Sequence, residues 1–181
     1  VLYSPRKQGA GLANILAAMS LPAYVVDPIC NIGDDPARTG EFTINFQVKS
    51  LVDDDMSYEM SYAVLRDYLV SGFNSLMSDG IDEDDLTIES NWKEDVVVVP
   101  SHETAYVTVT IQLSDKLKAE FDQAFPNGNF VEGYIELTET ERGWDNFHAT
   151  FMGFYGDWTE ASVMEPYSYI EVLEGEDLYY T

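Results

Sequence analysis

The sequence has 181 residues, with 33 acidic side chains against 9 basic ones, and its formal net charge is -24 at pH 7. A surface of this sign repels phosphate groups, so nucleic acids and anionic membranes are excluded as expected partners. The 45% hydrophobic fraction can fill the core of a single domain of this length. The longest apolar runs, at 15–19 and 96–99, are far shorter than the ~20 residues that span a bilayer, so we expect no membrane insertion. The single cysteine, Cys30, cannot form an internal disulfide.

The first predicted element is a short apolar helix over residues 10–19. Its leucine, isoleucine and methionine side chains recur at helical spacing, the segment carries no charge, and Pro22 follows shortly afterwards. Small residues at positions 9–11 let the backbone pass close to a packed neighbour. A chargeless helix is typical of one that is buried on more than one side. We therefore expect it to be covered by a protein body that this chain does not supply.

From residue 24 onward the hydrophobic period changes to two, which predicts β-strands with one face on a core and the other in water. Alternation or short apolar runs predict strands at 41–49, 58–64, 86–89, 96–99, 104–113, 130–137 and 148–155. Seven or eight short strands separated by turn residues predict a mainly β fold. The expected architecture is a fibronectin type III-like or immunoglobulin-like antiparallel β-sandwich, with a short N-terminal helix and one inserted helix.

The inserted helix is predicted directly after the strand at 104–113. Ser114 is a suitable N-cap, and Asp115 falls in the first turn. The apolar side chains on one helical face are Leu117, Phe121 and Phe125. A Pro-Asn-Gly turn at 126–128 ends the pattern, and we expect the helix to lie across one end of the sandwich.

Residues 65–80 fit two different structures. Their apolar residues share a helical face, yet Gly72 in the middle would weaken a helix by about 1 kcal/mol. The asparagine and serines around it also suit a loop. We therefore expect the end of a strand followed by a packed loop.

The residue types used in catalysis form no usable constellation in this sequence. His102 and His148 neighbour no glycine-flanked turn that would hold a serine nucleophile. One cysteine and two separated histidines give no zinc-ligand spacing, and the glycines at 9 and 11 lack the preceding strand and the third glycine of a dinucleotide loop. An enzyme that uses two carboxylates stays open as an alternative, because 33 acidic residues supply many pairs and single out none.

Two weaker patterns indicate ligands. A loop rich in hard oxygen ligands is a candidate calcium site, although it does not follow the order of an EF-hand. Its members are Asp79, Asp82, Asp84 and Asp85, with Glu83 between them. No cofactor is expected apart from this candidate calcium ion. Trp144, between a glycine and an aspartate in a hairpin connection, is the candidate for an exposed ring that stacks on a sugar.

Two parts of the sequence resemble a known group of proteins. Residues 4–15, which read Ser-Pro-Arg-Lys-Gln-Gly-Ala-Gly-Leu-Ala-Asn-Ile, resemble the segment that closes the catalytic domain in lactocepin-like cell-envelope subtilisin-like proteases of Gram-positive bacteria. Residues 127–137 contain Phe-Val-Glu-Gly-Tyr, and residues 151–158 contain Gly-Phe-Tyr-Gly-Asp-Trp. These stretches resemble two strands of the fibronectin type III-like domain that follows the protease in the same group.

The resemblance implies a division of the chain and a role for it. Residues 1–21 would be the C-terminal remnant of a subtilisin-like catalytic domain, and residues 22–181 the sandwich that follows. The family's Gly-Thr-Ser-Met-Ala type nucleophile motif is absent, so no residue here is assigned a catalytic role. The implied function is that of a non-catalytic accessory domain of a secreted or cell-wall serine endopeptidase, which supports the catalytic domain and helps to recognise a substrate.

The implied partners are the parent protease domain, in an intramolecular contact, and a peptide or protein substrate of the parent. The implied location is extracellular, in a Gram-positive bacterium. Charge adds an independent argument, because a face dense in carboxylates attracts cationic substrate segments and salt weakens that attraction. The alternative function is a surface adhesion or carbohydrate-binding β-sandwich module.

Overall fold

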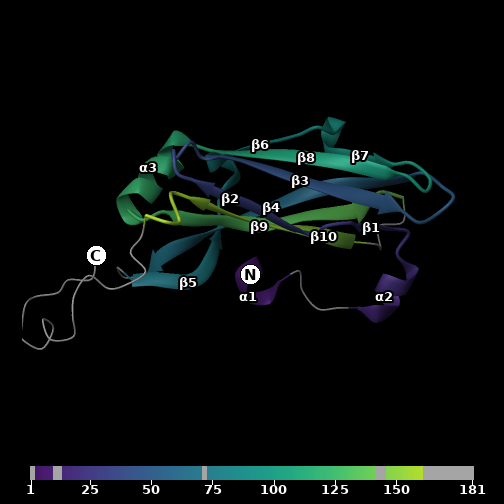
Figure 1. The fold of residues 1–181 in the computed structure, drawn as a ribbon, viewed down its shortest axis with the longest axis horizontal. Helices are drawn as coiled ribbons and strands as arrows, with labels where there is room; N and C mark the ends of the chain where they lie inside the picture. Colours follow the sequence, from purple (N-terminus) through teal and green to yellow (C-terminus); the bar gives the residue numbers. More distant parts are fainter. Residues whose placement is uncertain (1–2, 10–13, 71–72, 142–145, 161–181) are drawn as a thin grey trace, which may run out of the picture.

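The computed structural model describes residues 3–9, 14–70, 73–141 and 146–160, and they form a sandwich of two β-sheets (Figure 1). The four-stranded sheet has the order β1 (Ala23–Val25), β3 (Glu41–Ser50), β8 (Thr104–Leu113) and β6 (Leu86–Ser90). The six-stranded sheet has the order β2 (Ile29–Asp35), β10 (Asn146–Tyr155), β9 (Asn129–Glu139), β4 (Met56–Val70) and β5 (Phe73–Gly80), and β7 (Val96–Val99) also pairs with β4. The predicted mainly β sandwich is confirmed.

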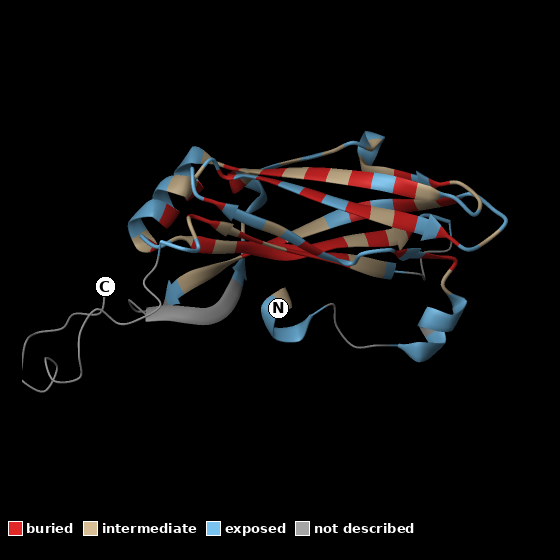
Figure 2. Cartoon of the chain, viewed as in Figure 1, coloured by how far each residue is buried: buried red, intermediate tan, exposed pale blue. Residues whose placement is uncertain are grey.

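Strict alternation builds the core between the sheets. In β3 the residues Phe42, Ile44, Phe46 and Val48 are buried while their neighbours face outward, and β8 alternates in the same way. Figure 2 shows the buried residues recurring along the strands of both layers. Each buried side chain of this size contributes about 1.5 to 3 kcal/mol, so a slip of one residue in register would expose the whole set.

The two sheets are antiparallel except at one edge, where β2 runs parallel to β10. The strands β1 and β2 were not predicted individually. The sequence at 33–36 indicates a turn, but Gly33, Asp34 and Asp35 lie in β2 and face β10, which has a register shift between Met152 and Gly153. A three-residue β1 and a polar β2 are too short and too irregular for their period to be visible.

The segment at 65–80 differs from the expected strand end and packed loop. β4 continues to Val70 and β5 returns antiparallel to it, with a register shift between Asp67 and Tyr68. The side chain of Asn129 supports this extension, because its Nδ2 donates to the Asp67 carbonyl and its Oδ1 accepts from the Asp67 amide. The bulge breaks the period of two, and this is why the sequence also fits a helix.

The inserted helix is confirmed as α3 (Asp115–Ala124), which lies at one end of the sandwich (Figure 1). The Ser114 hydroxyl accepts a hydrogen bond from the Leu117 amide at 3.1 Å, and Leu117 and Phe121 are buried. Two short 3-10 helices, η1 (Glu83–Asp85) and η2 (Lys93–Asp95), precede β6 and β7. Among the described residues, no helix has the length and apolar character needed to cross a membrane.

The N-terminal segment forms two helices, α1 (Pro5–Gln8) and α2 (Ile15–Ser20), on the side of the six-stranded sheet (Figure 1). The predicted helix at 10–19 is thus found over its second half and extends one residue further, while residues 10–13 lie outside the described residues. α1 was not predicted, because four residues are too few for a periodic pattern.

Candidate functional site: the junction between α1 and the sandwich

α1 is a single helical turn with a cap at each end. The Ser4 hydroxyl accepts a hydrogen bond from the Arg6 amide at 3.1 Å, and Pro5 occupies the first turn, where its missing N–H costs nothing. At the other end, Gly9 has a φ of 60° and its amide donates to the Pro5 carbonyl at 2.8 Å. A positive φ favours glycine there. The Ser-Pro-Arg-Lys-Gln-Gly stretch therefore encodes one complete turn.

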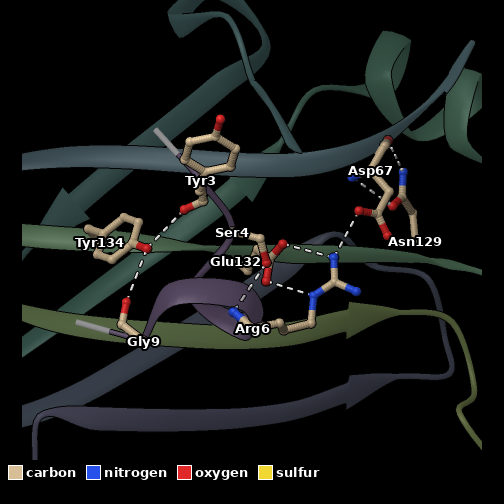
Figure 3. A network of polar contacts seen from close by, with 8 residues as sticks. All are labelled: Tyr3, Ser4, Arg6, Gly9, Asp67, Asn129, Glu132 and Tyr134. Atoms are coloured by element: carbon tan, nitrogen blue, oxygen red, sulfur yellow. Dashed lines mark hydrogen bonds and ion pairs between the residues drawn. The ribbon is translucent and has the colours of Figure 1, made fainter. Parts of the chain in front are cut away.

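Arg6 attaches this turn to the sheet (Figure 3). Its Nε donates to Glu132 Oε2 at 2.8 Å, and its Nη2 donates to Glu132 Oε1 at 2.9 Å and to Asp67 Oδ1 at 2.8 Å. The guanidinium carbon also lies 3.7 Å from the centroid of the Phe130 ring, in a cation–π contact. Two parallel hydrogen bonds thus join the Arg6 guanidinium to the Glu132 carboxylate, and we call this pair the Arg6 fork. Bidentate pairs of this kind are among the strongest charge-assisted hydrogen bonds.

Glu132 needs this partner because its side chain is 0% exposed. Its neighbours Val131 and Gly133 face the core, so the alternation of β9 directs Glu132 to the outer face, where α1 covers it. An unpaired carboxylate in such a place costs several kcal/mol. Burial alone would lower the pKa of Arg6, but the hydrogen bonds and charges of Glu132 and Asp67 outweigh it and raise that pKa above its ordinary value.

Tyr134 holds both ends of α1. Its hydroxyl accepts from Gln8 Nε2 at 2.9 Å. The same hydroxyl lies 2.9 Å from the Tyr3 carbonyl oxygen and 3.2 Å from that of Gly9 (Figure 3). The single hydroxyl proton is thus directed between two backbone oxygens on either side of the turn. Together with the Arg6 fork, this contact fixes both the position and the direction of the N-terminal segment.

Two hollows lie beside the junction. One, of about 570 Å³, is lined by Arg6 and by an aromatic cluster of Phe130, Phe154 and Trp158, whose ring centroids are 5.0 to 5.3 Å apart. The other, of about 380 Å³, is lined by Gln8 and His148 among others. Both are open to solvent in this chain.

α2 presents an apolar surface to solvent. The side chains of Ile15, Leu16 and Met19 are 74%, 81% and 81% exposed. Figure 2 shows the helix outside the buried core. The described residues of this chain therefore do not cover these side chains of the chargeless helix, and its coverage by another protein body stays a prediction.

The chain matches the Fn3-like domain family over residues 34–148. It belongs to that family. The match includes Glu132 and Tyr134 but not α1, so the junction joins the Fn3-like domain to the segment that precedes it.

Two named proteins are similar to this chain over more residues than the Fn3-like match covers. The chain is 25% identical over 178 residues to the PII-type proteinase of Lactococcus lactis subsp. cremoris, and the match covers 91% of this chain and 8% of that protein. It is 24% identical over 171 residues to the C5a peptidase of Streptococcus pyogenes serotype M6, covering 90% of this chain and 13% of that protein. Its backbone is also similar to a PapD-like domain of human CEP192, with a TM-score of 0.48, 7% identity, and coverage of 74% of this chain and 84% of that one.

These relatives confirm the resemblance to cell-envelope proteases that two sequence segments indicated. The chain spans about a tenth of the length of the proteases it matches. The two segments of the resemblance meet at the junction, since Arg6 comes from the first and Glu132 from the second. Sequence reasoning missed this contact, because nothing in the local patterns links residues that are 126 positions apart.

The carboxylates of the acidic loop do not converge on one point, as the ligands of a calcium site would. Asp82 and Asp84 are exposed, whereas Asp85 is turned inward, where it accepts from Ser114 Oγ at 2.9 Å and from Lys116 Nζ at 2.7 Å. Asp79 is exposed on β5. Over the described ranges, no three His, Cys, Asp or Glu side chains are arranged to hold a metal ion. Calcium binding stays a prediction that the arrangement does not support.

The remaining candidates of the Fn3-like domain lie apart from one another. Trp144 falls outside the described residues. His102 Nε2 lies 2.8 Å from Asp53 Oδ1 in an exposed turn, and His148 Nε2 lies 3.9 Å from Glu136 Oε1 on the outer face of the six-stranded sheet. Neither histidine was expected to act in a serine-nucleophile site, and each lies next to a carboxylate.

Proposed function

We propose that the chain is a non-catalytic accessory domain of a secreted or cell-wall subtilisin-like serine endopeptidase of a Gram-positive bacterium. Residues 1–21 would be the end of the catalytic domain, and residues 22–181 the sandwich that follows it. The observation that carries the proposal is the junction. Segments that resemble two different parts of such proteases bind each other through Arg6 and Glu132.

The proposed role is support of the catalytic domain. A flexible linker would not fix the orientation of the sandwich relative to the catalytic domain. In this chain, α1 is held on the sandwich by the Arg6 fork and, at both ends, by Tyr134. The exposed apolar face of α2 would then pack on the catalytic domain. Burial of three such side chains would stabilise that contact by several kcal/mol, at about 1.5 to 3 kcal/mol for each.

Substrate recognition is the finer part of the proposal. With a net charge of -24, the domain would raise the encounter rate of cationic substrate segments at low ionic strength. We expect the full-length endopeptidase to cleave a lysine-rich peptide more slowly as salt is added and after neutralisation of the exposed Asp79, Asp82, Glu83 and Asp84. A rate that is indifferent to both changes would count against this part of the proposal. Asp85 is left intact because its carboxylate holds the hydroxyl of Ser114, the N-cap of α3.

The contact of α2 is tested by one pair of matched variants. Leu16→Asp removes an apolar side chain from α2, and Leu51→Asp makes the same change at a 53% exposed position after β3. In the isolated chain, both variants should keep the wild-type urea midpoint. In the full-length endopeptidase, Leu16→Asp should lower the temperature of thermal inactivation and Leu51→Asp should not. Equal tolerance of both variants in the full-length enzyme would overturn the proposed contact.

A further inference from the structure

The outer face of the four-stranded sheet carries a surface that the junction does not use. In the antiparallel register of β3 and β8, Gln47 lies opposite Tyr106 and Asn45 lies opposite Thr108. Residues between them along each strand are buried, so these side chains point outward. We call this surface the amide–hydroxyl face, and its members are Thr43, Asn45, Gln47, Tyr106, Thr108 and Thr110.

This face lacks charge in a protein that is dense in charge. The outward positions of β3 are charged only at the two ends of the strand, at Glu41 and Lys49, and those of β8 are all uncharged. Aspartate and glutamate make up 33 of the 181 residues, so a neutral surface on two central strands is a departure from the rest of the chain. Asp27 and Glu89 on the two flanking sides, with Glu41 and Lys49 at the ends of β3, form a rim that is mainly acidic.

Hydrogen bonds hold part of the face, namely the side chains of Asn45 and Thr108 and the backbone of Tyr106. Thr108 Oγ1 donates to Asn45 Oδ1 at 2.8 Å, which turns the amide nitrogen of Asn45 away from Thr108. The backbone of Tyr106 is fixed by Trp92 Nε1 and Asn91 Nδ2, each of which donates to its carbonyl at 3.0 Å. Groups fixed in this way lose little conformational entropy when a ligand binds.

Tyr106 supplies a flat apolar ring at one end of the face, opposite Gln47. Its side chain is 66% exposed, and a shallow hollow of about 160 Å³ lies beside it, lined also by Asn45, Gln47 and Thr108. This volume is below the roughly 300 to 1,000 Å³ of pockets that enclose small molecules. The hollow therefore suits one ring of a longer chain that lies across the surface.

We propose that the amide–hydroxyl face binds an uncharged polysaccharide, with one sugar ring on Tyr106 and sugar hydroxyls bonded to Asn45 and Gln47. The distribution of charge on and around the face favours an uncharged ligand over an ionic one. An anionic glycan is repelled by the acidic rim and by the net charge, and a cationic partner finds no carboxylate on the face itself. An apolar protein surface would offer no partner to the Asn45 amide nitrogen or to the Gln47 carboxamide, whereas a hydroxyl-rich chain satisfies both.

The site is independent of the proposed role in an endopeptidase. α1 contacts β9 and β10 of the six-stranded sheet, while the amide–hydroxyl face belongs to the opposite layer (Figure 1). Both surfaces can be occupied at the same time. A loss of binding at one therefore leaves the other unchanged.

The test is titration calorimetry of the 181-residue chain with soluble neutral oligosaccharides derived from cellulose, mannan and chitin, and with an oligogalacturonate as the anionic probe. We expect at least one neutral oligosaccharide to bind and the anionic one not to bind. Tyr106→Ala should weaken that binding about tenfold through loss of ring stacking. Tyr3→Ala truncates a 52% exposed tyrosine ahead of α1 and should leave the affinity unchanged.

Two further measurements distinguish a loss of binding from a folding defect in the variant. Amide chemical shifts of Asn45, Gln47 and Thr108 should move on titration in the wild-type chain, and the urea midpoint of Tyr106→Ala should match that of the wild type because its side chain is exposed. The proposal is overturned if no neutral oligosaccharide binds, if the anionic probe binds equally well, or if Tyr3→Ala weakens binding as much as Tyr106→Ala.

Discussion

Arg6 is a surface residue that compensates a fully buried charge. Its replacement by alanine leaves Glu132 covered and without its main partner, and breaking a buried pair in this way costs about 3 kcal/mol. We expect Arg6→Ala to lower the free energy of unfolding of the isolated chain by about that amount, measured by urea denaturation. Lys7→Ala removes the same charge from the exposed neighbour in α1 and should cost less than about 0.5 kcal/mol.

A double variant separates charge from packing at the same site. Adding Glu132→Gln to Arg6→Ala removes the unpaired carboxylate, so part of the lost stability should return. If Arg6→Ala is no more destabilising than Lys7→Ala, or if Glu132→Gln makes the double variant still less stable, the Arg6 fork does not hold the segment in place.

Asp85 has a different structural role, as the anchor of the α3 cap. The hydrogen bonds from Lys116 and then Ser114 hold the pKa of Asp85 below its ordinary value of 3.8. A carboxylate with a lowered pKa stabilises the fold above its unfolded-state pKa, and the contribution is lost as the pH falls through the folded-state value. We therefore expect Asp85→Asn to be less stable than wild type at pH 7, with a difference in urea midpoint that narrows below about pH 4.

Asp84→Asn is the matched control for Asp85→Asn, because Asp84 is exposed and carries the same charge one position earlier. It should change the midpoint little at either pH. A difference between Asp85→Asn and wild type that is the same at pH 7 and pH 3 would show that the charge of Asp85 is not what stabilises the cap.

At the scale of elements, the pairing of β9 with β4 depends on a glycine at which the two backbones come close together. A Cβ at Gly133 would overlap the carbonyl oxygen of Ala63 and contact the Phe151 ring. We expect Gly133→Ala to force the two strands apart and to cost at least about 2 kcal/mol in urea denaturation. Gly80→Ala, at the end of β5 where a Cβ meets open space, should be nearly neutral. Equal midpoints for the two variants would contradict the close approach of β4 and β9.

The elements that could be predicted from sequence are those with a sustained period or a cap. β3 and β8 alternate over ten residues each, and α3 begins at a serine cap, so their positions were predicted closely. The β4–β5 hairpin was missed because the bulge at Asp67 interrupts the alternation. The junction was missed as a contact although both of its segments had been singled out, because the pairing of Arg6 with Glu132 depends on how the whole sheet folds.

At the scale of the whole molecule, the excess of carboxylates opposes compaction. With a net charge of -24, self-repulsion in the folded state is stronger than in the expanded chain, and salt shortens its range. We expect the urea midpoint of the isolated chain to rise when sodium chloride is raised from about 0.02 M to about 0.5 M. A midpoint that falls over this range would mean that attractive ion pairs, such as that of Arg6, outweigh the net repulsion.

The junction is the feature on which the proposed role depends, and it is tested most directly by the thermal inactivation of the full-length endopeptidase. Peptidase activity that remains after heating would be compared for wild type, Arg6→Ala and Lys7→Ala. If the sandwich supports the catalytic domain through α1, Arg6→Ala will lose activity at a lower temperature than both other proteins. Inactivation of all three at the same temperature would contradict that role.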